Sequence, residues 1–278
     1  MPARQSIQLG QVQESLLIPL YARAVDSLKK RPILKDPKAV EMVQSIEWDF
    51  RRFNQWRRIL GCTLRTAMFD DVVRDFLGRH PHGTVVEIGA GLNTRFERLD
   101  NGALHWFDLD LPDTVELRRK FFTDSERRVT LAASILDPGW IAAVRQSPGP
   151  YCFVAEAVFI YLTEQEVKAA LAQIAANFPR ATLAFDTVTL AAVNHENKDH
   201  ARRNLGARFA WACQDPREIE RWKIGLRLLE SRSMMDIPDS LRSRLPLPVR
   251  AGMRVIVKLF PKLANACRLN LYTTQMEA

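Results

Sequence analysis

One stretch, residues 84–112, constrains the fold of this chain more than any other: TVVEIGAGLNTRFERLDNGALHWFDLDLP. It opens with a short apolar run that is typical of a buried parallel strand. The chain then turns through Gly89 and Gly91, and a second apolar run ends in Asp108 and Asp110. A glycine-rich turn after one strand, with a carboxylate closing the next about 20 residues later, indicates a nucleotide-binding α/β site.

Strand-like and helix-like segments alternate after this stretch. Strands are expected over residues 84–89, 103–110, 128–135, 151–158 and 181–188. Helices are expected over 112–122, from 138 onward and over 164–178. This alternation predicts an α/β fold with a doubly wound, mostly parallel sheet. Two later strands, 225–233 and 268–274, would add an antiparallel hairpin at the sheet edge and bring the total to seven.

The segments before and after these strands look helical. Residues 1–82 predict three helices that form a cap or lid, and residues 83–278 form the core of the expected fold. Within that core, residues 190–224 predict a polar, helical insertion on the substrate side. Residues 250–266 predict an amphipathic helix broken at Pro261. Within it, core packing is favoured over membrane contact for residues 254–260.

Composition narrows the class of protein. Of the 278 residues, 47% are hydrophobic, and no apolar run reaches the ~20 residues that span a bilayer. The first residues do not resemble a signal peptide, so we expect a cytoplasmic protein without a membrane partner. The net charge of +8 is spread along the chain, which favours a generally basic composition over a functional basic face. Such a face would suit an anionic small molecule as well as RNA. The four cysteines are scattered, which argues against a disulfide framework and a metal site.

The glycine turn itself limits the ligand. A dinucleotide fingerprint needs a third glycine, but this turn continues through the sequence LNTR to Arg95. A phosphate-loop lysine is also absent. A turn without these phosphate-binding features fits a nucleoside that has no phosphates, and S-adenosylmethionine is the commonest cofactor of that kind.

Four motifs together resemble the leucine carboxyl methyltransferase family, and within it the branch of polyketide O-methyltransferases. They are EIGAGLNTRFERL, WFDLDLP, AEAVFIYL and FAWACQDPREIERW. The resemblance covers most of the chain from about residue 18 onward. It implies a class I methyltransferase fold, which is Rossmann-like, with S-adenosyl-L-methionine as cofactor and S-adenosyl-L-homocysteine as product.

The resemblance also implies a set of cofactor-binding residues. They are Arg23, Arg65, Glu87, Gly89, Ala90, Gly91, Asp110, Ser134, Ile135 and Glu156. The two arginines would meet the methionine carboxylate of the cofactor, Asp110 the ribose hydroxyls and Glu156 the methionine amino group. Ser134 and Ile135 would lie on the adenine side. Asn93 and Ser134 depart from the acidic residues that the family usually has, so we expect weakened or rearranged cofactor binding rather than its loss.

The acceptor is expected to be an oxygen atom. A carboxylate acceptor is ionised at neutral pH and needs no general base, so catalysis would rest on positioning and on removal of water. A phenol or alcohol needs a base, for which His195 and His200 are candidates. Neither histidine lies in a convincing motif, which favours a carboxylate. The candidates for holding an acidic substrate are Tyr161, Arg202, Arg203, Arg208 and Trp211.

The sequence therefore predicts an O-methyltransferase that converts a carboxylate of a small molecule or peptide to a methyl ester, in secondary metabolism. A hydroxyl-directed O-methyltransferase is the alternative on the same fold. A nucleic-acid-binding or RNA-modifying protein, suggested by the net charge of +8, is a more remote alternative.

Overall fold

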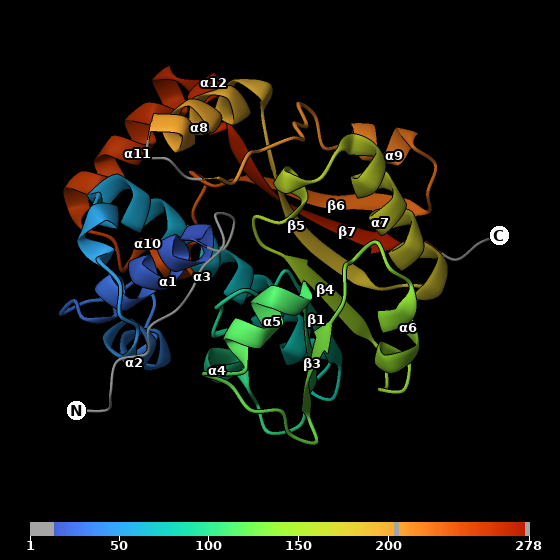
Figure 1. Ribbon diagram of the computed structural model, residues 1–278. Coiled ribbons are helices and arrows are strands. Elements are labelled where there is room, and N and C mark those ends of the chain that lie inside the picture. Colours follow the sequence, from blue (N-terminus) through green and yellow to red (C-terminus); the bar gives the residue numbers. More distant parts are fainter. Residues whose placement is uncertain (1–13, 203–205, 276–278) are drawn as a thin grey trace.

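A single sheet of seven strands organises the part of the chain that this computed structural model describes, residues 14–202 and 206–275 (Figure 1). The order of the strands across the sheet is β3-β2-β1-β4-β5-β7-β6. The strands are β1 (Thr84–Ile88), β2 (His105–Asp110), β3 (Arg128–Ala132), β4 (Tyr151–Ala155), β5 (Thr182–Val188), β6 (Leu226–Ser233) and β7 (Cys267–Thr274). Strands β1 to β5 are parallel, and β7 runs antiparallel to both β5 and β6. The predicted α/β sheet and its antiparallel edge are confirmed.

The strand order reverses at β1, which pairs with β2 on one side and β4 on the other. Ile88 at the end of β1 lies opposite Leu109 in β2 and Ala155 in β4. The carboxyl ends of the three strands are therefore level, so Gly89, Asp110 and Glu156 leave the sheet at one edge. Open α/β sheets bind their ligands at such a reversal point.

Helices cover both faces of the sheet (Figure 1). On one face, α6 (Gly139–Val144), α7 (Glu164–Asn177) and α9 (Glu218–Arg221) pack against side chains that include Val86 of β1. On the other face, α3 (Trp56–Arg79), α4 (Arg95–Leu99) and α10 (Asp239–Arg242) pack against side chains that include Val85. Adjacent residues of β1 thus face opposite layers, as the strand's two-residue period requires. Both faces are buried, which explains the continuous apolar runs in the sequence.

The N-terminal helices form a separate hydrophobic cluster. It is built by α1 (Glu14–Ser27), α2 (Pro37–Ser45) and the 3₁₀ helix η1 (Phe50–Phe53). Leu17 and Leu20 of α1 pack in it with Leu92, directly after the glycine turn, and with Leu117 of α5 (Pro112–Arg118). The first two helices therefore lie over the glycine turn, whereas α3 packs on the sheet. The division of the chain at residue 82 stays a prediction.

Several element boundaries differ from the expected ones. Strand β3 ends at Ala132 and α5 at Arg118, both short of the predicted ends. In the expected insertion, α8 (Leu190–Arg202) is helical, residues 206–217 are not, and α9 spans one turn. The capping box of α7 is present as predicted, with Thr163 and Glu166 each bonding the other's backbone. A second 3₁₀ helix, η2 (Phe159–Tyr161), follows β4.

The expectation of core packing for residues 254–260 is wrong. The helix expected over residues 250–266 is observed as α11 (Leu247–Leu259) and α12 (Pro261–Ala264), and α11 contains no buried residue. The helix lies beyond the packed layers, so only side chains such as Val249 and Met253 touch the core. No described helix is long and apolar enough to cross a membrane.

Candidate cofactor and substrate site

The glycine turn is a tight loop that strongly favours glycine at two positions. Gly89 and Gly91 have positive φ angles of 62° and 48°, a region that other residues rarely adopt. The Gly89 amide donates to the carbonyl of Leu109 at 2.7 Å, which joins the turn to β2. A Cβ atom at Gly89 would lie 2.5 Å from a methyl group of Val158. The turn and the segment after β4 therefore approach each other closely at the sheet's reversal point.

Asp110 fixes this turn from the end of β2. Its carboxylate accepts hydrogen bonds from the amide of Gly91 at 2.6 Å and from that of Leu111 at 2.7 Å. Burial raises the pKa of Asp110 above its usual value, although both amides act in the opposite direction. A carboxylate has about four acceptor positions, so Asp110 keeps acceptor capacity for the two hydroxyls of a ribose.

Glu156, directly after β4, is held by two arginines. Its Oε1 accepts from Nε of Arg65 at 3.0 Å and from the hydroxyl of Thr66 at 2.8 Å. Its Oε2 accepts from Nη2 of Arg95 at 2.6 Å. Burial alone would raise the pKa of Glu156, but the two guanidinium groups hold it at about 2. Glu156 is therefore an anion over the whole physiological pH range.

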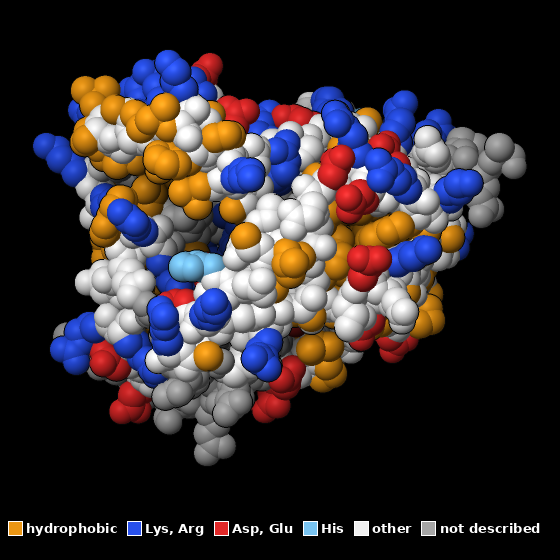
Figure 2. Space-filling model, turned by 90° about the horizontal axis from the view of Figure 1, so that it is seen from above, with side chains coloured by type: hydrophobic (Ala, Val, Ile, Leu, Met, Phe, Trp, Pro, Cys, Tyr) orange, Lys and Arg blue, Asp and Glu red, His pale blue; other side chains and the backbone are white. Residues whose placement is uncertain are grey.

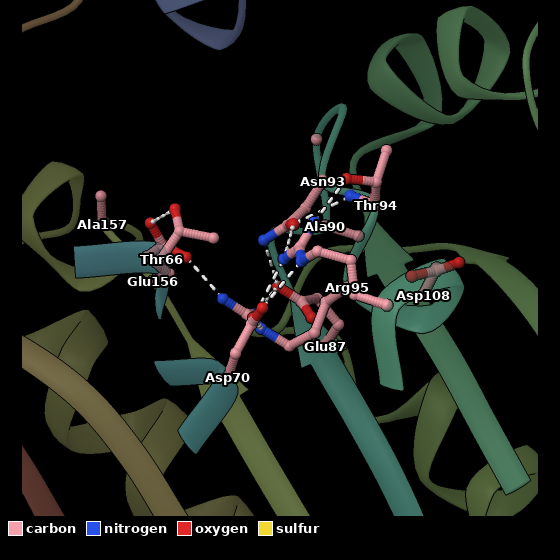
Figure 3. A network of polar contacts seen from close by, with 12 residues as sticks. Thr66, Asp70, Glu87, Ala90, Asn93, Thr94, Arg95, Asp108, Glu156 and Ala157 are labelled. Atoms are coloured by element: carbon pink, nitrogen blue, oxygen red, sulfur yellow. Dashed lines mark hydrogen bonds and ion pairs between the residues drawn. The ribbon is translucent and has the colours of Figure 1, made fainter. Parts of the chain in front are cut away.

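Arg95 lies at the centre of a buried network of charges (Figure 3). Its Nε donates to Asp70 of α3 at 2.8 Å, its Nη1 to Glu87 of β1, and its Nη2 to Glu156. Burial would lower the pKa of Arg95, but the three carboxylates raise it overall. One side chain thus joins α3, β1 and the segment after β4. The sequence pattern places Arg95 at the end of the glycine turn and does not predict this role.

Glu87 has an acceptor atom to spare. Its Oε1 accepts from the side-chain amide, Nδ2, of Asn93 at 3.0 Å, but its buried Oε2 has no hydrogen-bond partner among the described residues. Burial raises the pKa of Glu87 to about 7. Such an oxygen can accept a hydrogen bond from a cationic ligand, which would stabilise the ionised form.

Asn93 closes the far side of the turn. Besides donating to Glu87, its Oδ1 accepts from the amide of Thr94 at 2.8 Å and from Nη2 of Arg98 at 3.2 Å. An aspartate at this position cannot donate to Glu87. Asparagine is therefore suited to the contact that it makes here.

The two candidate arginines occupy different environments. Arg23 is buried, and donates to Asp36 at 3.0 Å and to the carbonyl of Leu92 at 2.7 Å. It fastens α1 to α2 and to the glycine turn, and it does not reach open space. The side chain of Arg65 is 22% exposed and makes one further contact, 3.9 Å from Asp186. Of the two, Arg65 is the one that can reach a ligand.

The adenine-side candidates follow β3 in a loop beside Asp110. The amide of Ala133 donates to the carbonyl of Asp110 at 2.9 Å, so this loop and the end of β2 are neighbours. The Ser134 hydroxyl accepts from the amide of Leu136 at 3.2 Å, and Ile135 is buried in the core. Ala90, between the two glycines, is also buried.

The substrate-side candidates are separated by the structure. Tyr161 is half-buried, and its ring lies edge-on to that of Phe209 at 5.2 Å between centroids. Trp211 is buried against Trp222 in the main core, so it is not available as a wall of a substrate pocket. Arg208 is exposed, as is Arg202, and Arg203 lies outside the described residues. We retain Tyr161 from this group.

Neither histidine is placed as a free base. His200 is buried, with Nδ1 2.8 Å from the carbonyl of Ala207 and its ring against Phe209. His195 is exposed on α8. His200 thus ties α8 to the segment that follows it.

Asp186, near the end of β5, was not among the sequence candidates. It is buried beside Arg65, and its Oδ1 accepts from the amide of Ala157 at 2.7 Å. Burial raises its pKa. An acidic residue inside the apolar segment LAFDTV is the signal that could have identified it, as the acidic residue after a strand identified Glu156.

The family assignment follows from comparison with known proteins. The family model described as leucine carboxyl methyltransferase matches residues 17–175, which include most of α1, Arg65, the glycine turn, Asp110 and Glu156. The chain belongs to the leucine carboxyl methyltransferase family. The predicted membership is therefore confirmed, and the protein is an S-adenosyl-L-methionine-dependent methyltransferase.

Two relatives extend the match over nearly the whole chain. The tetracenomycin polyketide synthesis O-methyltransferase TcmP of Streptomyces glaucescens is 33% identical over 97% of this chain and 99% of its own length. The S-adenosyl-L-methionine-dependent methyltransferase dpfgK of Gibberella zeae is 28% identical over 81% of this chain and 83% of its own length. A solved structure, the DUF574 family protein of Streptomyces avermitilis, has a TM-score of 0.57 at 13% identity. The match covers 94% of this chain and 97% of that protein, and it shows the shared fold.

The residues of the site fit the cofactor of this family. Arg65 offers a cation for the methionine carboxylate, and the unpartnered oxygen of Glu87 lies near Glu156 in the same charge network. Asp110 offers acceptors at the end of β2, where the ribose of a nucleoside would lie. These assignments of individual residues stay proposals.

Proposed function

We propose that this methyltransferase esterifies a carboxylate of a small molecule or peptide, in secondary metabolism. The placement of the histidines carries the proposal, because a carboxylate acceptor needs no base. His200 is committed to the carbonyl of Ala207, and His195 is exposed. The name of the family and the polyketide role of TcmP support a carboxylic acid of polyketide origin.

The chain's own residues would act by holding and orienting. Arg65, Glu87 and Glu156 would bind the two charged groups of the cofactor's methionine part, and Asp110 its ribose. When bound, the cofactor supplies a methyl group on a positively charged sulfonium. Tyr161, half-buried against Phe209, would border the acceptor. The acceptor oxygen would attack in line, so rate acceleration would come from alignment and from exclusion of water.

The chemical stability of the product tests this proposal. The protein is incubated with methyl-labelled cofactor and matched aromatic acids and phenols, and the products are then treated with mild alkali. A methyl ester releases labelled methanol, whereas a methyl ether retains its label. Alkali-stable label in products of the phenols alone would overturn the carboxylate proposal.

Hydroxyl methylation is the second candidate, and Asp186 is the observation in its favour. This buried acid with a raised pKa lies next to Arg65, at the edge of the sheet where ligands bind, and it is the type of group that can accept a proton. If the acceptor is a hydroxyl, Asp186→Asn should lower kcat by about 100-fold or more.

With a carboxylate acceptor, Asp186→Asn should change kcat by less than about tenfold, because no proton is transferred. Asparagine retains an oxygen for the amide of Ala157, so the local backbone is preserved. His195→Ala, on the exposed side of α8, is the matched control and should be silent with a carboxylate acceptor.

A further inference from the structure

Helix α11 presents an apolar surface to solvent. Val249 and Met253 face the core and are half-buried, whereas Val255 and Leu259 lie on the outer side. Residues four apart share one side of a helix, so the helix carries an inner and an outer apolar stripe. The inner stripe is satisfied by the fold. The outer stripe has no packing partner within the described chain.

The outer stripe continues into neighbouring elements. Phe260 and Leu263 extend the stripe along α12. Leu190 is the first residue of α8. The residue before α8 and a residue just after α12 are hydrogen-bonded, because the backbone amide of Thr189 donates to the carbonyl of Ala266 at 2.9 Å. The five side chains are Leu190, Val255, Leu259, Phe260 and Leu263, and they are 50% to 63% exposed. Figure 2 looks onto the end of the molecule that carries α8, α11 and α12, and shows hydrophobic side chains gathered among basic ones.

The charge of this region has one sign. Residues 240–268 contain seven Arg or Lys and no Asp or Glu, in a chain whose net charge is +8. Four of these cations, Arg250, Arg254, Lys258 and Lys262, follow one another at intervals of four residues. They therefore form a basic stripe beside the outer apolar stripe. Arg254, Lys258 and Lys262 are exposed, and none of them forms a salt bridge with a described residue.

We propose that the outer surface of α11 and α12 binds an anionic lipid bilayer, lying in the plane of the headgroups. A helix with large apolar side chains on one face, flanked by cations and lacking acids, has the pattern of an interfacial membrane helix. The cations complement anionic headgroups, and Leu259, Phe260 and Leu263 reach the acyl boundary. The exposed apolar side chains project from a convex helical surface, and a fluid lipid bilayer can adapt its shape to such a surface.

Vesicle sedimentation tests this proposal with the full-length protein. Phosphatidylcholine vesicles with and without phosphatidylserine are compared at low and high salt. We expect binding to the vesicles that contain phosphatidylserine, and weakening of that binding by salt. The variant Arg254→Glu/Lys258→Glu should lower the partition coefficient by at least about 30-fold.

A second variant and a control separate this surface from the general positive charge. Leu259→Gln/Leu263→Gln retains every cation but should also weaken binding by about tenfold or more, because apolar insertion is lost. Arg145→Glu/Lys168→Glu reverses two exposed charges near α6 and on α7, at another part of the surface, and should bind as the wild type does. Circular dichroism and cofactor binding confirm that each variant is folded.

Three outcomes would overturn the proposal. The first is an equal loss of vesicle binding in the control variant, which would show that binding depends only on the net charge of the protein. The second is full binding by the leucine variant, which would exclude insertion. The third is a lack of vesicle binding together with self-association, or with capture of an acidic protein, that Arg254→Glu/Lys258→Glu abolishes. That result would assign the surface to a protein partner.

Discussion

Arg65 and Glu156 neutralise each other at the sheet edge, with Nε of the arginine 3.0 Å from Oε1 of the glutamate. These are the two residues proposed for the carboxylate and the amino group of the cofactor's methionine part. A zwitterion carries both charges, so it can be exchanged for the internal ion pair without a change in the total charge of the site. Binding by such exchange avoids leaving an isolated charge in a buried position.

Replacement of Arg65 should therefore weaken cofactor binding. Arg65→Ala removes the partly exposed guanidinium while Arg95 continues to hold Glu156, so the fold of the site should persist. We expect the dissociation constant for S-adenosyl-L-methionine to rise by about 10- to 100-fold in calorimetric titrations. Arg58→Ala, two turns earlier in α3, breaks an ion pair with Asp199 and serves as the control. Unchanged affinity in Arg65→Ala would remove Arg65 from the proposed site.

Glu156 should make the stability of the protein depend on pH in the acid range. Its pKa is about 2 in the folded state and ~4.3 in an unfolded chain. A depressed folded pKa stabilises the protein above the unfolded value, and this contribution is lost as pH falls from about 4 to about 2. Urea unfolding should show that wild type loses about 2 kcal/mol more than Glu156→Gln over this range.

Glu87→Gln is the matched comparison, because the Glu87 carboxyl makes the unfolding free energy depend on pH with the opposite sign to Glu156. The pKa of Glu87 is raised to about 7, so its contribution is present at low pH and is lost as pH rises through that value. If both glutamine variants followed the wild-type pH dependence, the charge network in Figure 3 would not control either pKa.

The glycine turn should not tolerate a side chain at Gly89. Gly89→Ala combines a positive φ angle with a Cβ atom 2.5 Å from Val158, so we expect a loss of about 2–4 kcal/mol in unfolding free energy and weakened cofactor binding. Adding Val158→Ala should recover part of that loss by relieving the contact. Gly61→Ala in α3, where no atom lies within 4 Å, should be neutral or stabilising by up to about 1 kcal/mol.

An aspartate at position 93 should disturb Glu87. Asn93→Asp retains the acceptor for Thr94 and Arg98 but replaces the donor to Glu87 with a second negative charge. We expect a further rise in the pKa of Glu87 and a loss of about 1–3 kcal/mol in unfolding free energy, measured by thermal unfolding. Asn177→Asp removes one helix-surface bond to Gln173 and should have a smaller effect. Equal stability of Asn93→Asp and wild type would contradict this interpretation.

The sequence predicted the sheet well because its signals are local. Apolar runs, the glycine turn and Asp110 at the end of a strand each act within about 30 residues. Arg95 could not be interpreted in this way, because its role depends on Asp70 of α3 and on Glu156 after β4. Those partners meet only when three separate elements pack.

The substrate side shows a second limit of local patterns. Trp211 and His200 lie in a polar segment and were therefore natural candidates for ligand contacts, yet the fold buries both. Helix α11 shows the reverse case. Its amphipathic spacing predicts one buried stripe, but periodicity cannot distinguish a core from a lipid surface. Burial of individual side chains is a property of the complete fold.

Leu16 of α1 lies over Gly91, with its methyl group 3.0 Å from the position of a Cβ atom there. A ligand against the glycine turn would therefore share its surroundings with the first helix of the structure. Departure of the spent cofactor and arrival of the next would then be linked to movement of α1. In such an arrangement, movement of the N-terminal helix can limit the rate of turnover.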